Sequence, residues 1–177
     1  MDKDIKDLKV LIDNKTLIER IKALANDINS TYGVDEPLTI ICVLRGAVMF
    51  FSELAKYLKM PIKMEFVSLS SYGNSEKSSG EIKSFNLNLP KFENQNVLVV
   101  EDIVDTGLTL DFLIKFIETK CDAKSVKLAV LFDKKCARKY DVPVDFSAFE
   151  IDDKFIVGFG LDYAGYYRNL DYVGYFP

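Results

Sequence analysis

The sequence of 177 residues contains no histidine, only three cysteines and no long apolar run. The absence of histidine excludes His-dependent triads, HExxH zinc sites and histidine general bases, so acid–base chemistry must fall mainly to carboxylates, lysine, tyrosine or cysteine. Cys42, Cys121 and Cys136 are odd in number and far apart, which predicts reduced thiols in a cytoplasmic protein. The charged first ten residues do not resemble a signal peptide, and no segment is apolar enough to cross a bilayer. We therefore expect no membrane partner.

A strong positive charge is also missing. The formal net charge is −4, and no run of Lys or Arg is longer than Lys134–Lys135. A general nucleic-acid binder normally carries a basic surface, so we expect no nucleic-acid partner. Charged residues make up 28% and hydrophobic residues 49%, which is typical of a globular protein. The length and the absence of an evident linker or repeat predict a single domain over residues 1–177.

Short apolar segments alternate with helical patterns along the chain. We expect strands at residues 38–44, 62–69, 97–100, 126–132 and 155–159, and helices at residues 16–29, 47–58 and 110–118. Thr16 and Glu19 fit a capping box at the start of the first helix. Strands that alternate with helices indicate an α/β fold, with a mostly parallel twisted sheet flanked by helices.

The most informative segment is VLVVEDIVDTGLTL, at residues 97–110. Its apolar strand is followed by Glu101 and Asp102, and then by a turn with Asp105, Thr106 and Gly107 that opens a helix. Backbone amides in such a turn can surround a phosphate, and the helix dipole favours an anion at the same place. The two acids suit ribose hydroxyls or a Mg²⁺ ion. A charged strand end before a plain turn is the alternative, which we would favour for an isolated Glu-Asp pair.

This segment resembles the phosphoribosyl-pyrophosphate (PRPP) motif of type I phosphoribosyltransferases, especially of the group that acts on hypoxanthine and guanine. Four further motifs match that family in order: LRG at residues 44–46, SSYG at 70–73, LFDK at 131–134 and FIVGFGLDYAGYYRNL at 155–170. The resemblance covers roughly residues 38–174. It implies the family's fold with a flexible lid and a small hood, and a Mg²⁺-dependent transfer from PRPP to N9 of a 6-oxopurine in purine salvage. It also implies a homo-oligomer, either a dimer or a tetramer.

The resemblance assigns roles to residues of the PRPP site. Asp105 matches the catalytic acid that handles the proton at purine N7. The implied PRPP-binding residues are Leu44, Arg45 and Gly46 in a pyrophosphate loop with a cis peptide, Glu101 and Asp102 near the ribose, Asp105, Thr106, Gly107, Leu108 and Thr109 around the 5′-phosphate, and Arg168 at the pyrophosphate. The implied metal ligands are Glu101, Asp102 and Asp162.

The purine site is implied in the same way. Lys134 matches the lysine that donates to the 6-oxo group, Phe155 the ring that stacks on the base, and Ile156 a backbone contact to the purine edge. Asp162 matches an acid that borders the base and the metal. Outside these motifs, Arg45, Lys134, Asp162 and Arg168 would be interpreted as surface charges and Phe155 as a core residue.

Residues 70–89 lack a sustained period of two or 3.6 residues and are rich in Ser, Asn, Gly and Lys. Long segments of this kind in a compact domain are usually functional or mobile. We expect them to form a lid, with Ser71 and Tyr72 at its start, that closes over PRPP; a loop without a role is the alternative. For the whole protein, the alternatives are a phosphoribosyltransferase that prefers xanthine or another base, and a PRPP-sensing regulator that binds nucleic acid.

Overall fold

A computed structural model describes residues 5–69 and 88–177 of the chain. Its main sheet has five strands: β2 (Leu38–Leu44), β3 (Ile62–Ser68), β4 (Asn96–Val104), β5 (Ser125–Asp133) and β6 (Phe146–Glu150). The spatial order is β3-β2-β4-β5-β6, and every neighbouring pair is parallel. The predicted α/β fold with a parallel sheet is confirmed. The predicted lid residues Ser71 and Tyr72 lie outside the described residues.

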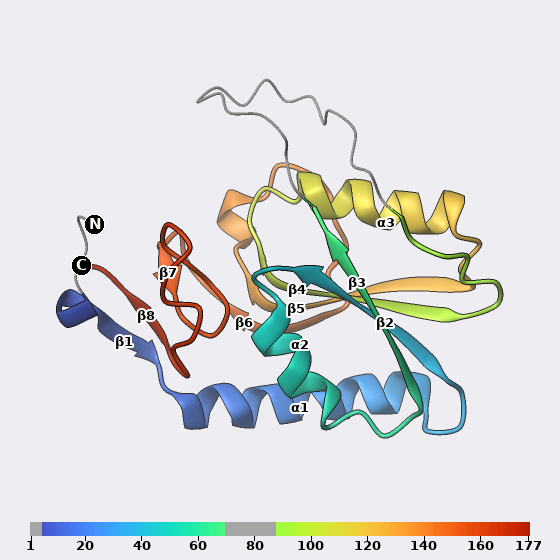
Figure 1. Cartoon of the computed structure of the whole chain (residues 1–177), viewed down its shortest axis with the longest axis horizontal. Helices are drawn as coiled ribbons and strands as arrows, with labels where there is room; N and C mark the ends of the chain where they lie inside the picture. Colours follow the sequence, from blue (N-terminus) through green and yellow to red (C-terminus); the bar gives the residue numbers. More distant parts are fainter. Residues whose placement is uncertain (1–4, 70–87) are drawn as a thin grey trace.

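Helices cover both faces of this sheet (Figure 1). On one face lie α1 (Asn14–Tyr32) and α2 (Val48–Ala55), and on the other lies α3 (Leu108–Lys120). Two short 3-10 helices, η1 (Ile5–Asp7) and η2 (Lys135–Ala137), complete the described helices. Strands buried on both faces can be apolar at every position, as β2 is from Ile40 to Leu44. The two layers of helices therefore enclose two apolar cores, one on each side of the sheet.

The first helix begins earlier than predicted. Its N-cap is Asp13, whose Oδ1 accepts a hydrogen bond of 2.8 Å from the backbone N–H of Thr16. The predicted capping box of Thr16 and Glu19 is wrong, because Thr16 is inside the first turn and is itself the capped residue. The helix packs one apolar face on the sheet, where Leu17 and Ile21 are fully buried.

A second, antiparallel sheet forms the predicted hood. It contains β1 (Lys9–Ile12), β8 (Val173–Tyr175) and β7 (Ile156–Val157), in the order β1-β8-β7. Figure 1 shows this sheet beside the end of the main sheet where the parallel strands finish. The strand predicted at residues 155–159 is thus shorter and belongs to the hood, because Gly158, Phe159 and Gly160 all have positive φ angles and end it.

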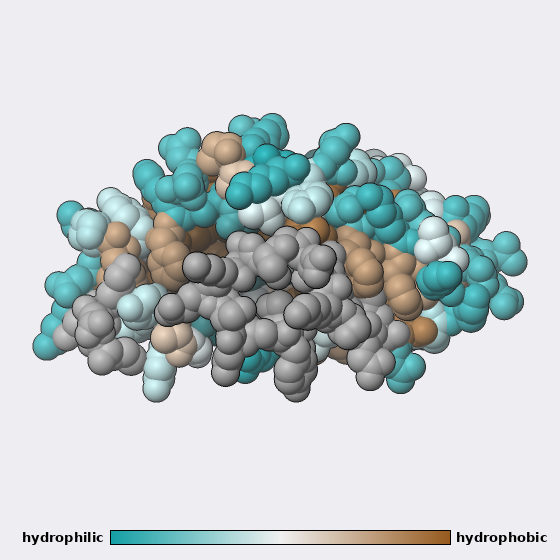
Figure 2. All heavy atoms as spheres, turned by 90° about the horizontal axis from the view of Figure 1, so that it is seen from above, coloured by the Kyte–Doolittle hydropathy of each residue, from teal (hydrophilic) through white to brown (hydrophobic). Residues whose placement is uncertain are grey.

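The surface is largely hydrophilic on the face shown in Figure 2, with apolar patches near its middle. In the described part of the chain, no helix has both the length and the apolar character needed to span a bilayer.

Candidate active site

A cavity of about 310 Å³ opens at the carboxyl ends of β2 and β4. Parallel strands bring their carboxyl ends to one edge of the sheet, where open α/β folds bind ligands. The described residues that line it are Val43, Leu44, Gly46, Leu69, Glu101, Asp102, Ile103, Val104, Asp105, Thr106, Gly107, Thr109, Leu110, Asp162 and Arg168. Most of the residues predicted to bind PRPP are therefore brought to one cavity, although Arg45 and Leu108 are not among those lining it.

The turn after β4 presents the start of a helix to this cavity. Gly107 is the N-cap of α3, with a φ of 88°, and α3 begins at Leu108, two residues earlier than predicted. No side chain of the described residues caps this end, so the N–H groups of the first turn remain available to an anion. Asp105 is exposed at the cavity, just after the strand.

Besides its positive φ, glycine at position 107 is favoured by the close packing behind the turn. A Cβ there would lie 3.1 Å from both the Cδ of Arg138 and the carbonyl oxygen of Tyr140, and 3.2 Å from the Cγ2 of Val142. These atoms belong to the segment that follows η2. The turn at Thr106–Gly107 is therefore packed against that segment on one side and faces the cavity on the other.

Two carboxylates occupy the end of β4. Glu101 Oε1 accepts the backbone N–H of Asp102 at 3.0 Å, and Asp102 Oδ1 accepts that of Ile103 at 2.8 Å. Burial, together with the negative charge of Asp102, raises the pKa of Glu101 well above its usual value. Two adjacent carboxylates in this setting offer hard oxygen ligands, and a cation bound to them would relieve their repulsion.

The end of β2 passes very close to these acids. The peptide bond between Leu44 and Arg45 is cis, as the resemblance implies. A Cβ on Gly46 would overlap the carboxylate of Asp102, and a Cβ on Gly160 would overlap the carbonyl oxygen of Gly46. The backbone at Gly46 is therefore held between β4 and the hood, and both contacts need glycine.

Arg168 and Asp162 meet on the hood side of the cavity. Arg168 Nη2 lies 2.5 Å from Asp162 Oδ1, and its Nη1 donates to the carbonyl oxygen of Gly160 at 2.6 Å. The other oxygen of Asp162 accepts the N–H of Gly165 at 2.7 Å. Within residues 5–69 and 88–177, no three Asp, Glu, Cys or His residues are arranged to hold a metal ion. A Mg²⁺ ion at Glu101 and Asp102 would accordingly take further ligands from substrate and water.

Of the residues predicted to bind purine, only Asp162 is among the described residues that line the cavity. Lys134 is buried, its backbone N–H donates to the Val104 carbonyl at 3.1 Å, and its Nζ lies 3.0 Å from Asp153 Oδ1. The ring of Phe155 is 54% exposed and meets Tyr163 edge-on, with centroids 5.9 Å apart. Ile156 is buried in β7.

Sequence reasoning missed some residues at this site. Val43, Leu69, Ile103, Val104 and Leu110 line the cavity without having been given a role. Their only signal was a place at or near a predicted strand or helix end. Asp153 was missed as well, because nothing local indicates that it pairs with Lys134.

Residues 8–164 match the family described as the phosphoribosyl transferase domain. The chain is 43% identical over 166 residues to a hypoxanthine-guanine phosphoribosyltransferase of Bacillus subtilis, covering 94% of this chain and 91% of the relative. Its fold matches a crystal structure of a hypoxanthine-guanine phosphoribosyltransferase of Bacillus anthracis, with a TM-score of 0.85, 37% identity, and 94% and 97% coverage. A Trypanosoma cruzi hypoxanthine phosphoribosyl transferase, studied for the role of its C-terminal region in oligomeric state and activity, matches with a TM-score of 0.86, 35% identity, and 96% and 91% coverage.

Proposed function

The chain belongs to the phosphoribosyl transferase family, and we propose that it transfers the phosphoribosyl group of PRPP to N9 of hypoxanthine or guanine, releasing pyrophosphate. The protein is a phosphoribosyltransferase of purine salvage. The observation that carries the proposal is the cavity in which an uncapped helix start, two adjacent carboxylates and the cis peptide loop meet. These three features match the three parts of PRPP, namely the anionic 5′-phosphate, the ribose with its hydroxyls and the anionic pyrophosphate.

Binding of PRPP would use backbone groups more than side chains. The N–H groups at Thr106–Thr109 would hold the 5′-phosphate at the positive end of α3. Glu101 and Asp102 would bind the ribose hydroxyls, and the backbone at Leu44–Gly46 would hold the pyrophosphate. Arg168 would add positive charge there, and to do so it would exchange part of its contact with Asp162 for the ligand.

The chemical step exchanges one bond at C1′ for another. The bond from C1′ to the pyrophosphate oxygen breaks, the bond from N9 to C1′ forms, and positive charge develops on the ribose ring in between. Asp105 would accept the proton that the purine loses, held at N7. Lys134 would donate to the 6-oxo group, and Phe155, whose ring is exposed, would stack on the base.

The residues present fit a Mg²⁺ ion, since Glu101 and Asp102 are adjacent hard ligands, and burial together with the charge of Asp102 raises the pKa of Glu101. Bound with PRPP, the ion would offset the charge on the departing pyrophosphate. Asp162 is the third ligand that we propose, although in the free protein it is paired with Arg168.

Assembly and location are part of the same proposal. We propose a homo-oligomer, dimer or tetramer, which is supported by a group of exposed apolar side chains on α2 and β3 that includes Met49, Met64 and Phe66. A cytoplasmic location is supported by the three cysteines, which are all free thiols.

The decisive experiment is a product assay with four bases. The purified chain is incubated with PRPP and Mg²⁺ and with hypoxanthine, guanine, xanthine or adenine in turn, and nucleotides are separated by chromatography. We expect inosine and guanosine monophosphates, and their loss when Mg²⁺ is chelated. Preference for xanthine would redirect the proposal to another base, and no nucleotide from any 6-oxopurine would refute it.

A further inference from the structure

Behind the phosphate turn lies a segment in which only Lys134 has been given a role in binding or chemistry. It runs from Asp133, the last residue of β5, through η2 to Val142. Lys134, the proposed purine lysine, directly follows Asp133, so this segment begins at the purine side of the site. Its other end reaches the turn at Thr106–Gly107, on the phosphate side. The segment therefore connects the two parts of the site through the protein.

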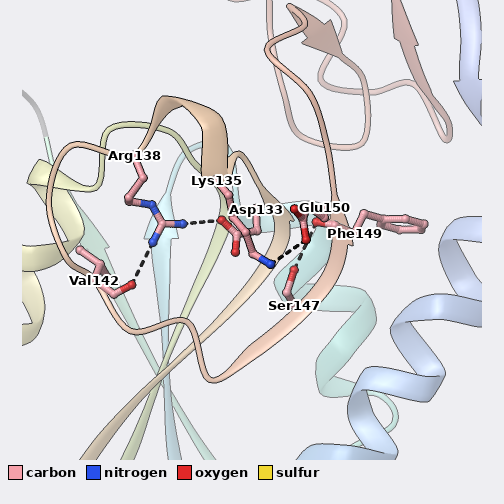
Figure 3. Close-up of polar contacts among 7 residues, drawn as sticks. All are labelled: Asp133, Lys135, Arg138, Val142, Ser147, Phe149 and Glu150. Atoms are coloured by element: carbon pink, nitrogen blue, oxygen red, sulfur yellow. Dashed lines mark hydrogen bonds and ion pairs between the residues drawn. The ribbon is translucent and has the colours of Figure 1, made fainter.

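The side chain of Arg138 links the two ends of this segment. Figure 3 shows Arg138 between Asp133 and the backbone of Val142. Its Nη2 pairs with Asp133 Oδ1, and its Nη1 donates to the Val142 carbonyl at 2.9 Å. The Asp133 side chain is only 5% exposed and that of Arg138 only 18%, so the pair is shielded from water and little screened by salt. The planar guanidinium reaches both acceptors at fixed angles, which a lysine cannot do.

The same segment is in turn bonded to the phosphate turn. The backbone N–H groups of Lys139 and Tyr140 both donate to the carbonyl oxygen of Thr106, at 3.0 Å each. The Cδ of Arg138 lies 3.1 Å from where a Cβ of Gly107 would be, so that its side chain backs the turn directly. With its carbonyl held on this side, Thr106 fixes the orientation of the peptide unit whose N–H belongs to Gly107.

We propose that Arg138, through its pair with Asp133, is a positioning residue that holds the 5′-phosphate loop in its binding geometry. This inference rests on the proposed function and adds to it the residue that orients the phosphate loop from behind. Arg138 does not touch the substrate in this account. It acts on the Thr106 carbonyl through the backbone of Lys139 and Tyr140, and on Gly107 by packing.

The test measures how much the 5′-phosphate contributes to binding. Guanosine monophosphate and guanosine differ only in that phosphate. The dissociation constant of guanosine divided by that of guanosine monophosphate therefore measures how much the phosphate adds to binding. We expect Arg138→Gln to reduce this ratio about tenfold, to raise the KM for PRPP, and to leave the KM for hypoxanthine and the affinity for guanosine within about twofold. Arg138→Lys should give an intermediate ratio, because a lysine keeps the positive charge but lacks the planar fork of the guanidinium.

Lys135→Gln is the matched control. Lys135 begins the 3-10 helix that Arg138 follows, and it pairs with Glu150 at 2.6 Å, with both side chains more than 60% exposed (Figure 3). The ratio of the two dissociation constants for Lys135→Gln should equal that of the parent. If Arg138→Gln does not fold, the ratio for Arg138→Lys decides by the same criterion.

Two results would overturn the inference. One is an equal loss of affinity for both ligands, which indicates only a general loss of structure. The other is a folded Arg138 variant with an unchanged ratio. Failure of the proposed function gives a different result, because the parent chain itself would then form no nucleotide and bind guanosine monophosphate no better than guanosine.

Discussion

Replacing Gly46 with alanine should damage the site and the fold together. The added Cβ would overlap the carboxylate of Asp102, which is 7% exposed and accepts the N–H of Ile103. To relieve the overlap, Asp102 must turn away and give up that bond. Overpacking costs about 1–3 kcal/mol and loss of a hydrogen bond to a charged group about 1.5–3 kcal/mol, so we expect about 4 kcal/mol in total.

For a chain of this size, that loss corresponds to a fall in melting temperature of about 8–16 °C, which calorimetry measures. The KM for PRPP should rise about tenfold or more, since the carboxylate and the Gly46 backbone both line the cavity. Gly33→Ala is the control for stability alone. Gly33 has a φ of 76° and a ψ of −167°, with no atom within 4 Å of its Cβ position, so alanine should cost about 1–3 kcal/mol through backbone strain and leave the KM unchanged.

A double variant tests the cause directly. If the overlap with Asp102 is the reason, Gly46→Ala should cost little more in a chain that already carries Asp102→Ala, because the obstructing carboxylate is gone. Strictly additive losses in the double variant would refute the reasoning. An unchanged melting temperature and KM for Gly46→Ala alone would do so as well.

The remaining predictions concern the proton, the base, the buried acid and the helix cap. Asp105→Asn should lower kcat about 10²-fold with little change in melting temperature, and turnover within about twofold of the parent in steady-state kinetics would exclude it as the proton acceptor. Lys134→Met should remove the preference for hypoxanthine over adenine, measured as the ratio of their kcat/KM values, because an ammonium group donates hydrogen bonds but accepts none. Burial and Asp102 raise the pKa of Glu101 in the folded state, so its contribution to stability is full below its ordinary pKa and is lost as the pH rises through the raised value. Thermal unfolding with a chelator present should therefore depend less on pH in Glu101→Gln than in the parent, and equal dependence would contradict this. Asp13→Ala should cost about 1 kcal/mol in urea unfolding, whereas Thr16→Val should cost less, because Asp13 still accepts the backbone N–H of residue 16 in that variant.

Local patterns were enough to predict four of the five strands of the main sheet and the principal motif, but β6 was missed. The apolar segment at residues 38–44 coincides with β2, and the strand at 97–100 lies in the first half of β4. A strand buried on both faces is recognisable because every position in it is apolar, and the phosphate turn because its residues are consecutive. The hood could not be predicted in this way. Its strands have two to four residues each, too few to show a period.

The sequence by itself determined the fold class and the family, and it predicted many of the residues that line the cavity, since these depend on neighbours along the chain. Only the tertiary structure decided which distant residues act together. Lys9 pairs with Tyr175 across the hood, Gly46 is held between Asp102 and Gly160, and Lys134 pairs with Asp153. Such contacts depend on where the loops bring the chain back, and a charged or glycine residue carries no local mark of its partner. Asp162 and Arg168 show the same point. The family motif contains both residues, but only the folded hood brings them together as an ion pair.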